Sequence, residues 1–275
     1  MRAIWKGAVS FGLVYVPVKL YAATESRDIK FNYLHEKCKT PIEYRRWCPS
    51  CETEVPMEEI VRGYEYEKGR YVVIQDDDFE KAGPRSGRNI EILDFVNLTD
   101  IDPIYYDKAY YLAPGDGGAK VYELLRRAMF DAGRVAVSRV VIRSRQALAA
   151  IRAGAGSLVM STMHYPAEIR EADSLPEMNY RVVLHDNEVK MAVNLIDSLA
   201  ADFRPEKYND TYREHLMETI QARIAGEAVE VPPQPDTGRV VDLMEALKAS
   251  IELAKEERHK GQAKTGKTAA RRKTS

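Results

Sequence analysis

In several segments before residue 163, apolar and polar residues alternate with the two-residue period that is typical of β-strands. Short runs rich in Val, Ile, Tyr and Phe are separated by glycine, proline or charged residues, and each run predicts a strand or a pair of strands. Such a series of short strands favours an antiparallel sheet that closes into a barrel. The predicted runs lie at residues 4–24, 29–33, 62–75, 89–96, 104–112, 135–142, 148–151 and 158–163.

Three local signals refine this prediction. Residues 62–75 have the pattern of a hairpin that turns at Lys68-Gly69. Pro17 lacks a backbone N–H, so it predicts an edge strand or the start of a strand. Residues 119–132 carry apolar side chains on one helical face and end at Gly133, which predicts a helix. The glycines before this helix lack the Lys-Ser/Thr ending of a nucleotide-binding loop, and they are interpreted as a turn.

From Lys190 the pattern becomes helical. A helix begins there, and a second helix at residues 208–225 repeats an apolar or aromatic residue every four positions, at Tyr208, Tyr212, Leu216 and Ile220. This stripe predicts a packing face for the chain's own barrel or for a second subunit. After a stiff proline-rich linker, residues 241–254 predict a third helix, whose apolar residues include Leu243, Met244, Leu247 and Ile251.

The third predicted helix is short, amphipathic and separated from the rest by the linker, which is the form of a helix that docks on a partner. Folding back on the core is the alternative. From Gly261 onward no apolar side chain is larger than Ala, so this tail is predicted to be disordered.

Charge is segregated along the chain although its net value is only −1. Residues 255–275 contain eight Lys or Arg against two Glu, and residues 124–167 contain seven Arg against one Asp. Basic segments on an acidic body are expected of a protein that grips an anionic polymer with chosen faces. No apolar run approaches the roughly 20 residues of a membrane span, so no membrane partner is expected.

All three cysteines lie within residues 31–55, together with a histidine. Their spacing is His35-x2-Cys38, nine residues, then Cys48-x2-Cys51, which is suited to a tetrahedral zinc ion. Four protein ligands would leave no position for substrate, so such a zinc would be structural. A cysteine-only site and buried, reduced thiols without metal are the alternatives. The small clustered set of cysteines also favours a reducing compartment, and we expect the cytosol.

No catalytic constellation is evident in the sequence. The other histidines lie far apart, and no Gly-x-Ser-x-Gly motif occurs. Asp173 with Glu188 and Lys190 is only a weak nuclease signal. A zinc-containing nuclease and a zinc-ribbon DNA-binding regulator remain as alternative classes.

Several segments, in order along nearly the whole chain, resemble bacterial Ku proteins. They include RAIWKG at residues 2–7, SFGLV at 10–14, VPVKLY at 16–21, GYEYE at 63–67, YYLAP at 110–114 and YNDTYRE at 208–214. The resemblance implies an α+β, mainly β fold: an antiparallel β-barrel core with an extended bridge loop in residues 1–200, a helical dimerisation arm at 190–230, and a linker, docking helix and flexible basic tail at 231–275.

The resemblance also implies a function in non-homologous end joining. Two subunits would form a homodimeric ring that binds double-stranded DNA ends without sequence specificity and recruits an ATP-dependent DNA ligase, with no chemistry of its own. The expected dimer contacts are Tyr208, Tyr212, Leu216 and Ile220, and the expected ligase contacts are those named on the third helix. The expected phosphate contacts are Arg27, Lys30, Lys37, Lys39, Arg45, Arg46, Arg139, Arg143 and Arg145.

Overall fold

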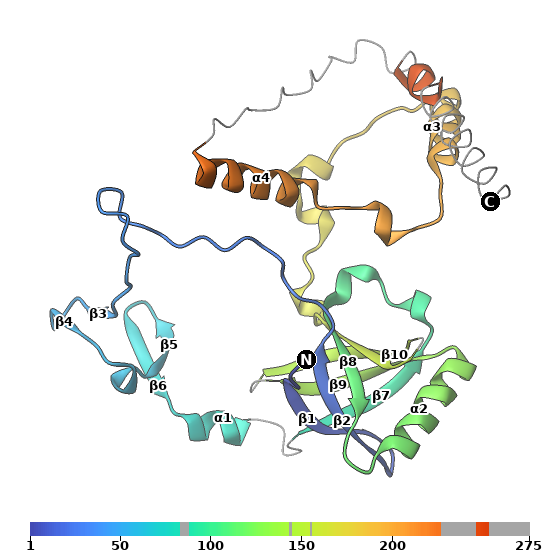
Figure 1. Cartoon of the computed structure of the whole chain (residues 1–275). Coiled ribbons are helices and arrows are strands. Elements are labelled where there is room, and N and C mark those ends of the chain that lie inside the picture. The colour runs from blue at the N-terminus through green and yellow to red at the C-terminus, as the bar shows by residue number, and fades with distance from the viewer. Residues whose placement is uncertain (83–87, 143–144, 155, 227–245, 253–275) are drawn as a thin grey trace, which may run out of the picture. The chain divides into compact units, whose positions relative to one another are not determined.

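The computed structural model describes residues 1–82, 88–142, 145–154, 156–226 and 246–252 (Figure 1). The contacts divide the chain into two units, Met1–Ser174 and Leu175–Ser275, and each is described by itself. The first unit contains every strand of the described residues, and the second contains the helices α3 and α4.

Seven strands of the first unit close into a barrel, as the alternating pattern predicted (Figure 1). Around the barrel the order is β1-β2-β8-β11-β10-β9-β7. Six of these neighbours pair antiparallel, but β1 and β7 pair parallel, from Ala8 opposite Asn89 to Ser10 opposite Glu91. The barrel therefore differs from the predicted antiparallel barrel only in the parallel pairing of β1 with β7, which forms its seam. The bounds are β1 (Trp5–Phe11), β2 (Val14–Ala22), β7 (Asn89–Val96), β8 (Tyr106–Pro114), β9 (Val135–Ile142), β10 (Arg145–Ala153) and β11 (Leu158–Met163).

The position of Pro17 differs from the prediction. Strand β2 is paired on both sides, with β1 and with β8, so it is not an edge strand. Pairing with β8 begins only at Val18, and the Pro17 carbonyl accepts a 2.7 Å hydrogen bond from the Gly115 N–H. In an extended residue the backbone nitrogen and the carbonyl point to the same side of the strand. The nitrogen of Pro17 therefore lies on the β8 side, beyond the end of the β2–β8 pairing, and its missing hydrogen removes no hydrogen bond from that pairing.

The core fills the inside of the barrel with every second side chain of its strands. Val9 and Val16 face each other across β1 and β2, and both are fully buried. The other fully buried large side chains include Leu20, Ile90, Leu112, Ile151, Leu158 and Met160.

Helix α2 (Ala119–Ala132) covers the barrel with Tyr122, Leu125 and Met129, which lie on one helical face (Figure 1). It ends at Gly133, whose φ of 62° is the left-handed conformation that a C-cap glycine adopts. The Tyr122 hydroxyl accepts a 2.8 Å hydrogen bond from the Leu158 N–H and donates one of 2.6 Å to the Leu112 carbonyl. The helix is thereby bonded to β8 and β11.

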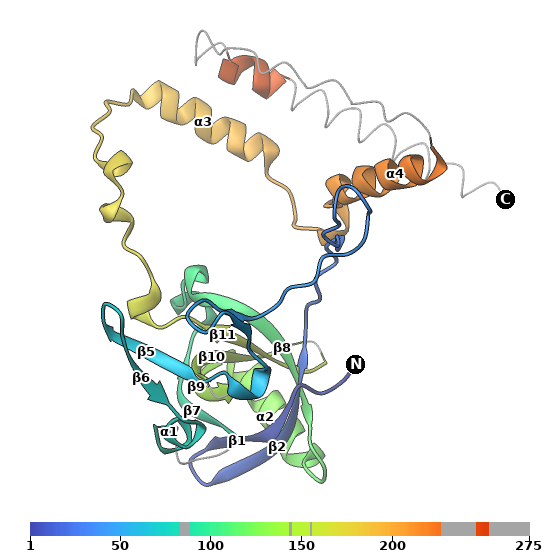
Figure 2. The same ribbon diagram turned by 90° about the vertical axis from the view of Figure 1, so that its left-hand side faces the viewer.

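An insertion between β2 and β7 holds β3 (Trp47–Cys48), β4 (Thr53–Glu54), β5 (Arg62–Glu67), β6 (Arg70–Ile74) and α1 (Asp76–Ala82). The hairpin predicted at residues 62–75 is confirmed as β5 and β6, which pair as a separate ribbon (Figure 2). The strand predicted at residues 29–33 is wrong. No described strand pairs with this segment, and Phe31 and Tyr33 are exposed.

The second unit contains α3 (Asp186–Leu199) and α4 (Thr211–Ala225). Helix α3 begins at Asp186 rather than Lys190, because the Glu188 carboxylate accepts a 2.9 Å hydrogen bond from the His185 N–H and caps the helix there. Helix α4 begins at Thr211, where the Asp210 side chain accepts from the Arg213 N–H. Tyr208, predicted to start this helix, instead ends the short turn Pro205–Lys207. Residues 246–252 are helical, whereas Leu243 and Met244 lie outside the described residues.

Candidate nucleic-acid interface

The insertion between β2 and β7 presents most of the predicted phosphate-binding cations. Lys30, Lys37, Lys39 and Arg46 are exposed, and none of them makes an ion pair with a residue that the structure describes. Arg27 lies 3.3 Å from a Glu25 carboxylate oxygen, and Arg45 lies 3.6 Å from one of Glu54. Such exposed pairs contribute little, so a phosphate can compete with them.

The predicted barrel arginines lie on neighbouring strands. Arg139 is exposed on β9, opposite Glu91 of β7 and Leu148 of β10. Arg145 begins β10 and pairs with Glu168 at 3.3 Å, while its side chain stays 83% exposed. Arg143 lies outside the described residues. Of the two predicted barrel arginines that the structure describes, Arg139 therefore makes no ion pair and Arg145 forms one exposed pair.

The hairpin β5–β6 carries cations that the sequence analysis missed. Arg70 lies 5.4 Å over the Tyr66 ring and pairs with Glu67 at 2.9 Å. Arg62 lies 5.1 Å over the Phe79 ring and pairs with Asp76 at 3.3 Å. All six residues of β5 are exposed, so the hairpin has two solvent faces. The alternation of tyrosine with glutamate in β5 predicts one packed face, so no sequence signal indicated that both faces are exposed.

The cysteines and His35 form two pairs. The His35 Nδ1 and the Cys38 sulfur lie 3.0 Å apart, and Cys48 is hydrogen-bonded to Cys51. Cys38 and Cys51 are exposed and Cys48 is half-buried, so the alternative of buried thiols is wrong. Among the described residues no three His, Cys, Asp or Glu are grouped so that they could hold a metal.

The surroundings of the thiols shift their acidity. Hydrogen bonds from Thr40 and then from His35 lower the pKa of Cys38 to about 7. Backbone N–H groups of Cys51 and Ser50 lower the pKa of Cys48, whereas the bond shared with Cys48 raises the pKa of Cys51. In each pair one thiol is therefore favoured as a thiolate, the form that binds metals.

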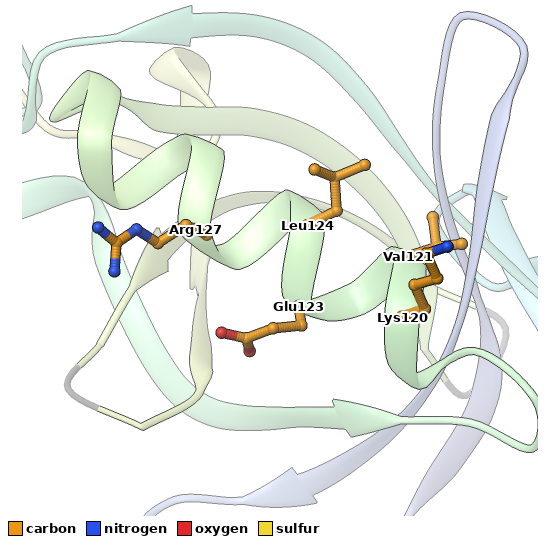
Figure 3. Close-up of a pocket in the computed structure, with 5 residues that line it drawn as sticks. All are labelled: Lys120, Val121, Glu123, Leu124 and Arg127. Carbon is orange, nitrogen blue, oxygen red and sulfur yellow. The ribbon is translucent and has the colours of Figure 1, made fainter.

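A shallow hollow on α2 is lined by Lys120, Val121, Glu123, Leu124 and Arg127 (Figure 3). Glu123 pairs with Arg126 at 2.6 Å, and Arg127 pairs with Asp131 at 2.9 Å. The glutamate and the arginine that line this hollow are therefore both engaged with neighbours on the helix. No helix in the described ranges is long and apolar enough to cross a membrane.

A closed barrel whose long insertion exposes unpaired cations is suited to binding an anionic polymer. The family model described as "Ku70/Ku80 beta-barrel domain" matches residues 10–191, and the chain belongs to the Ku family.

Relatives support the same assignment. The chain is 55% identical over 260 residues to a protein of Symbiobacterium thermophilum, covering 94% of this chain and 64% of that one. It is 47% identical over 276 residues to a protein of Heliobacterium modesticaldum, covering 100% and 99%, and 43% identical over 255 residues to one of Bacillus subtilis, covering 92% and 82%. All three are named "Non-homologous end joining protein Ku". The chain thus spans less than two thirds of the first relative and nearly all of the second.

Proposed function

We propose that the protein is a non-enzymatic homodimeric ring that binds double-stranded DNA ends without sequence specificity in the repair of double-strand breaks. The observation that carries this proposal is membership of the Ku family together with a barrel whose insertion exposes unpaired lysine and arginine side chains. The names of the relatives place those proteins in non-homologous end joining.

Phosphate contacts explain why binding would not depend on sequence. Lys30, Lys37, Lys39 and Arg46 are long, exposed cations in segments without regular helix, and no recognition helix presents them to a groove. Contacts to phosphate position a protein on duplex but carry no base information. Each phosphate neutralised releases counterions, so affinity falls steeply with salt.

The second unit supplies the argument for a homodimer. Neither α3 nor α4 has a buried residue, and apolar side chains along this unit are mostly exposed, among them Val183, Ile196 and Phe203. On the predicted stripe, Tyr208 and Tyr212 are 69% and 75% exposed, while Leu216 and Ile220 are half-buried. Helices of this length gain most of their stability by packing an apolar face, so a second copy would cover these surfaces.

Recruitment of an ATP-dependent DNA ligase completes the proposal. Joining two ends requires a new phosphodiester bond, which the recruited ligase would form. The docking helix is argued from the sequence and from Leu247 and Ile251, which are half-buried in the helical residues 246–252. A reducing cytosol agrees with three free cysteines in the structure.

The test compares linear duplex with covalently closed circular duplex of the same sequence. The protein should bind the linear form, and it should lose affinity steeply as salt rises. Equal affinity for both forms would refute the ring and favour a zinc-ribbon regulator. Cleavage of either DNA that depends on Mg²⁺ would instead favour the nuclease.

A further inference from the structure

Two tyrosines lie side by side on the wall of the barrel. They belong to β2 and β8, which are followed in the sheet by β11 and β10 (Figure 2). In the register of these four strands, Tyr21 lies opposite Tyr111, Tyr111 opposite Val159, and Val159 opposite Arg152. These four residues cross the wall in one line and are called the tyrosine row.

The tyrosine row faces outward, because the neighbouring row fills the core. Leu20, Leu112 and Leu158 lie opposite one another on the same strands, and all three are fully buried inside the barrel. Successive residues of a strand point to opposite faces, so Tyr21 and Tyr111 point away from the core. Tyr111 is exposed and Tyr21 is half-buried. Neither ring is therefore required to fill the barrel.

Small side chains flank the two rings. Along β8, the residues on the same face as Tyr111 are Ala109 and Ala113, and Ser161 of β11 lies opposite Ala109. Within the described part of the chain, neither tyrosine ring is paired with another aromatic ring. No bulky neighbour along β8 covers the rings, so a flat ligand can reach them.

Positive charge borders the tyrosine row on two sides. Arg152 ends the row on β10, where it is exposed and makes no ion pair with any residue that the structure describes. At the other side, Lys6 of β1 lies opposite Lys19 of β2. Lys19 pairs with Asp116 at 2.7 Å, whereas Lys6 is exposed and has no such partner among the described residues. The charges of Lys6 and Arg152 are therefore left for an anion.

Aromatic faces between cations suit a single strand of nucleic acid. A base stacks on the ring while lysine or arginine binds a neighbouring phosphate. In a duplex the base faces are stacked on one another, so only unpaired bases can reach a protein ring. The tyrosine row crosses three strand intervals, about 14 Å. This length corresponds to about four nucleotides at roughly 3.4 Å each.

We propose that the tyrosine row binds the unpaired overhang of a DNA end. Tyr21 and Tyr111 would each stack one base, and Lys6 and Arg152 would bind neighbouring phosphates. Such contacts accept any sequence, because every base has a face that can stack. The proposal rests on the proposed function for the source of the strand. A duplex held by the protein delivers its overhang at high effective concentration, so the row needs little affinity for free single strands.

The test measures binding of the full chain to labelled duplexes by fluorescence anisotropy. One duplex is blunt, and two others carry an overhang of about four thymidines on the 3′ or the 5′ strand. At least one overhang should raise the affinity of the native protein about fivefold or more over the blunt duplex. Tyr21→Ala and Tyr111→Ala should each remove most of this gain and leave binding of the blunt duplex unchanged, which also shows that the variants are folded.

Two matched controls locate the effect in the rings of the row. Tyr111→Phe keeps the ring and should keep the gain. Tyr15→Ala removes an exposed tyrosine that lies on β2 outside the row, opposite Ser10, and should also keep the gain. Loss of the gain in either control would overturn the proposal.

An abasic overhang separates stacking from charge. It keeps the phosphates but has no bases, so most of the gain should disappear, and an equal gain would overturn the stacking. Tighter binding of an RNA overhang of the same length would overturn the assignment to DNA. Native protein that binds blunt ends and gains nothing from either overhang would overturn this proposal alone. If no duplex is bound, the proposed function fails, and binding of a free thymidine strand decides the row: weakening by Tyr111→Ala supports it, and no weakening overturns it.

Discussion

The hydroxyl of Tyr122 offers the sharpest test of how the barrel is held together. This side chain is only 5% exposed, and its oxygen lies between the Leu158 N–H and the Leu112 carbonyl, whose residues face each other across β8 and β11. Tyr122→Phe removes one oxygen atom and keeps the ring. The change therefore isolates the two hydrogen bonds from the packing of α2.

The expected loss of stability follows from the two backbone groups that lose their hydrogen-bond partner. Leu112 and Leu158 are both fully buried, so water does not replace the lost partner at their backbone groups. A buried donor or acceptor left without a partner costs about 1–3 kcal/mol. With a donor and an acceptor affected, we expect Tyr122→Phe to destabilise the barrel by about 2–4 kcal/mol. At about 2–4 °C per kcal/mol for a domain of this size, Tm should fall by roughly 4–16 °C.

Tryptophan fluorescence can follow the barrel alone. The chain has two tryptophans: Trp5 packs against the barrel core, and Trp47 lies in β3 of the insertion. In a Trp47→Phe background, Trp5 reports unfolding of the barrel during a urea titration. Protein concentration is held constant, because association shifts apparent stability.

Tyr111→Phe is the matched control. Tyr111 neighbours Leu112 on β8, is 41% exposed and makes no hydrogen bond through its hydroxyl to a described residue, so its loss should change stability by less than about 0.5 kcal/mol. Equal midpoints and slopes for the two variants would refute the reasoning. In that case the hydroxyl contributes nothing beyond the ring. Faster hydrogen exchange at the Leu158 amide in Tyr122→Phe would independently locate the effect.

Three further predictions test the barrel seam, the helical arm and the tail. Gly7→Ala should destabilise the barrel by about 1–3 kcal/mol in the same titration, because the new Cβ would lie 2.1 Å from the Arg88 carbonyl, whereas Gly156→Ala meets open space and should be neutral. Leu216→Asp should weaken dimerisation at least about tenfold in sedimentation, by burying an unpaired charge in the proposed interface, and a dimer of unchanged affinity contradicts it. Deleting residues 261–275 should flatten the salt dependence of DNA binding while ligase stimulation at saturating DNA persists. Deletion from residue 241 should abolish that stimulation, and loss of it with the shorter deletion contradicts the assignment.

Patterns that depend on near neighbours were readable from the sequence. The predicted bounds of β7, β9 and α2 match the structure, because alternation defines the strands and Gly133 ends the helix locally. The spacing of His35, Cys38, Cys48 and Cys51 was visible in the sequence as well, whereas their separation into two pairs appears only in the folded chain.

The state of each candidate phosphate contact was decided by residues distant in sequence. The sequence placed Arg139 and Arg145 in one basic segment, but folding brings Glu168 to Arg145 and leaves Arg139 unpaired. The hairpin arginines Arg62 and Arg70 were overlooked for a related reason. A count of charge over a long segment does not show whether a single cation is exposed. The exposure of a cation depends on which strands are covered in the folded chain.

By itself, the sequence determined the sites of most strands, the covering helix and the spacing of four metal-ligand candidates. The tertiary structure alone decided that β1 meets β7 in parallel, that Pro17 lies in an interior strand, and that residues 29–33 form no strand. The physical reason is that alternation fixes which face of a strand is apolar. The partner of that strand is chosen only when the whole sheet closes, so that every interior backbone group finds a bond and every apolar face is buried.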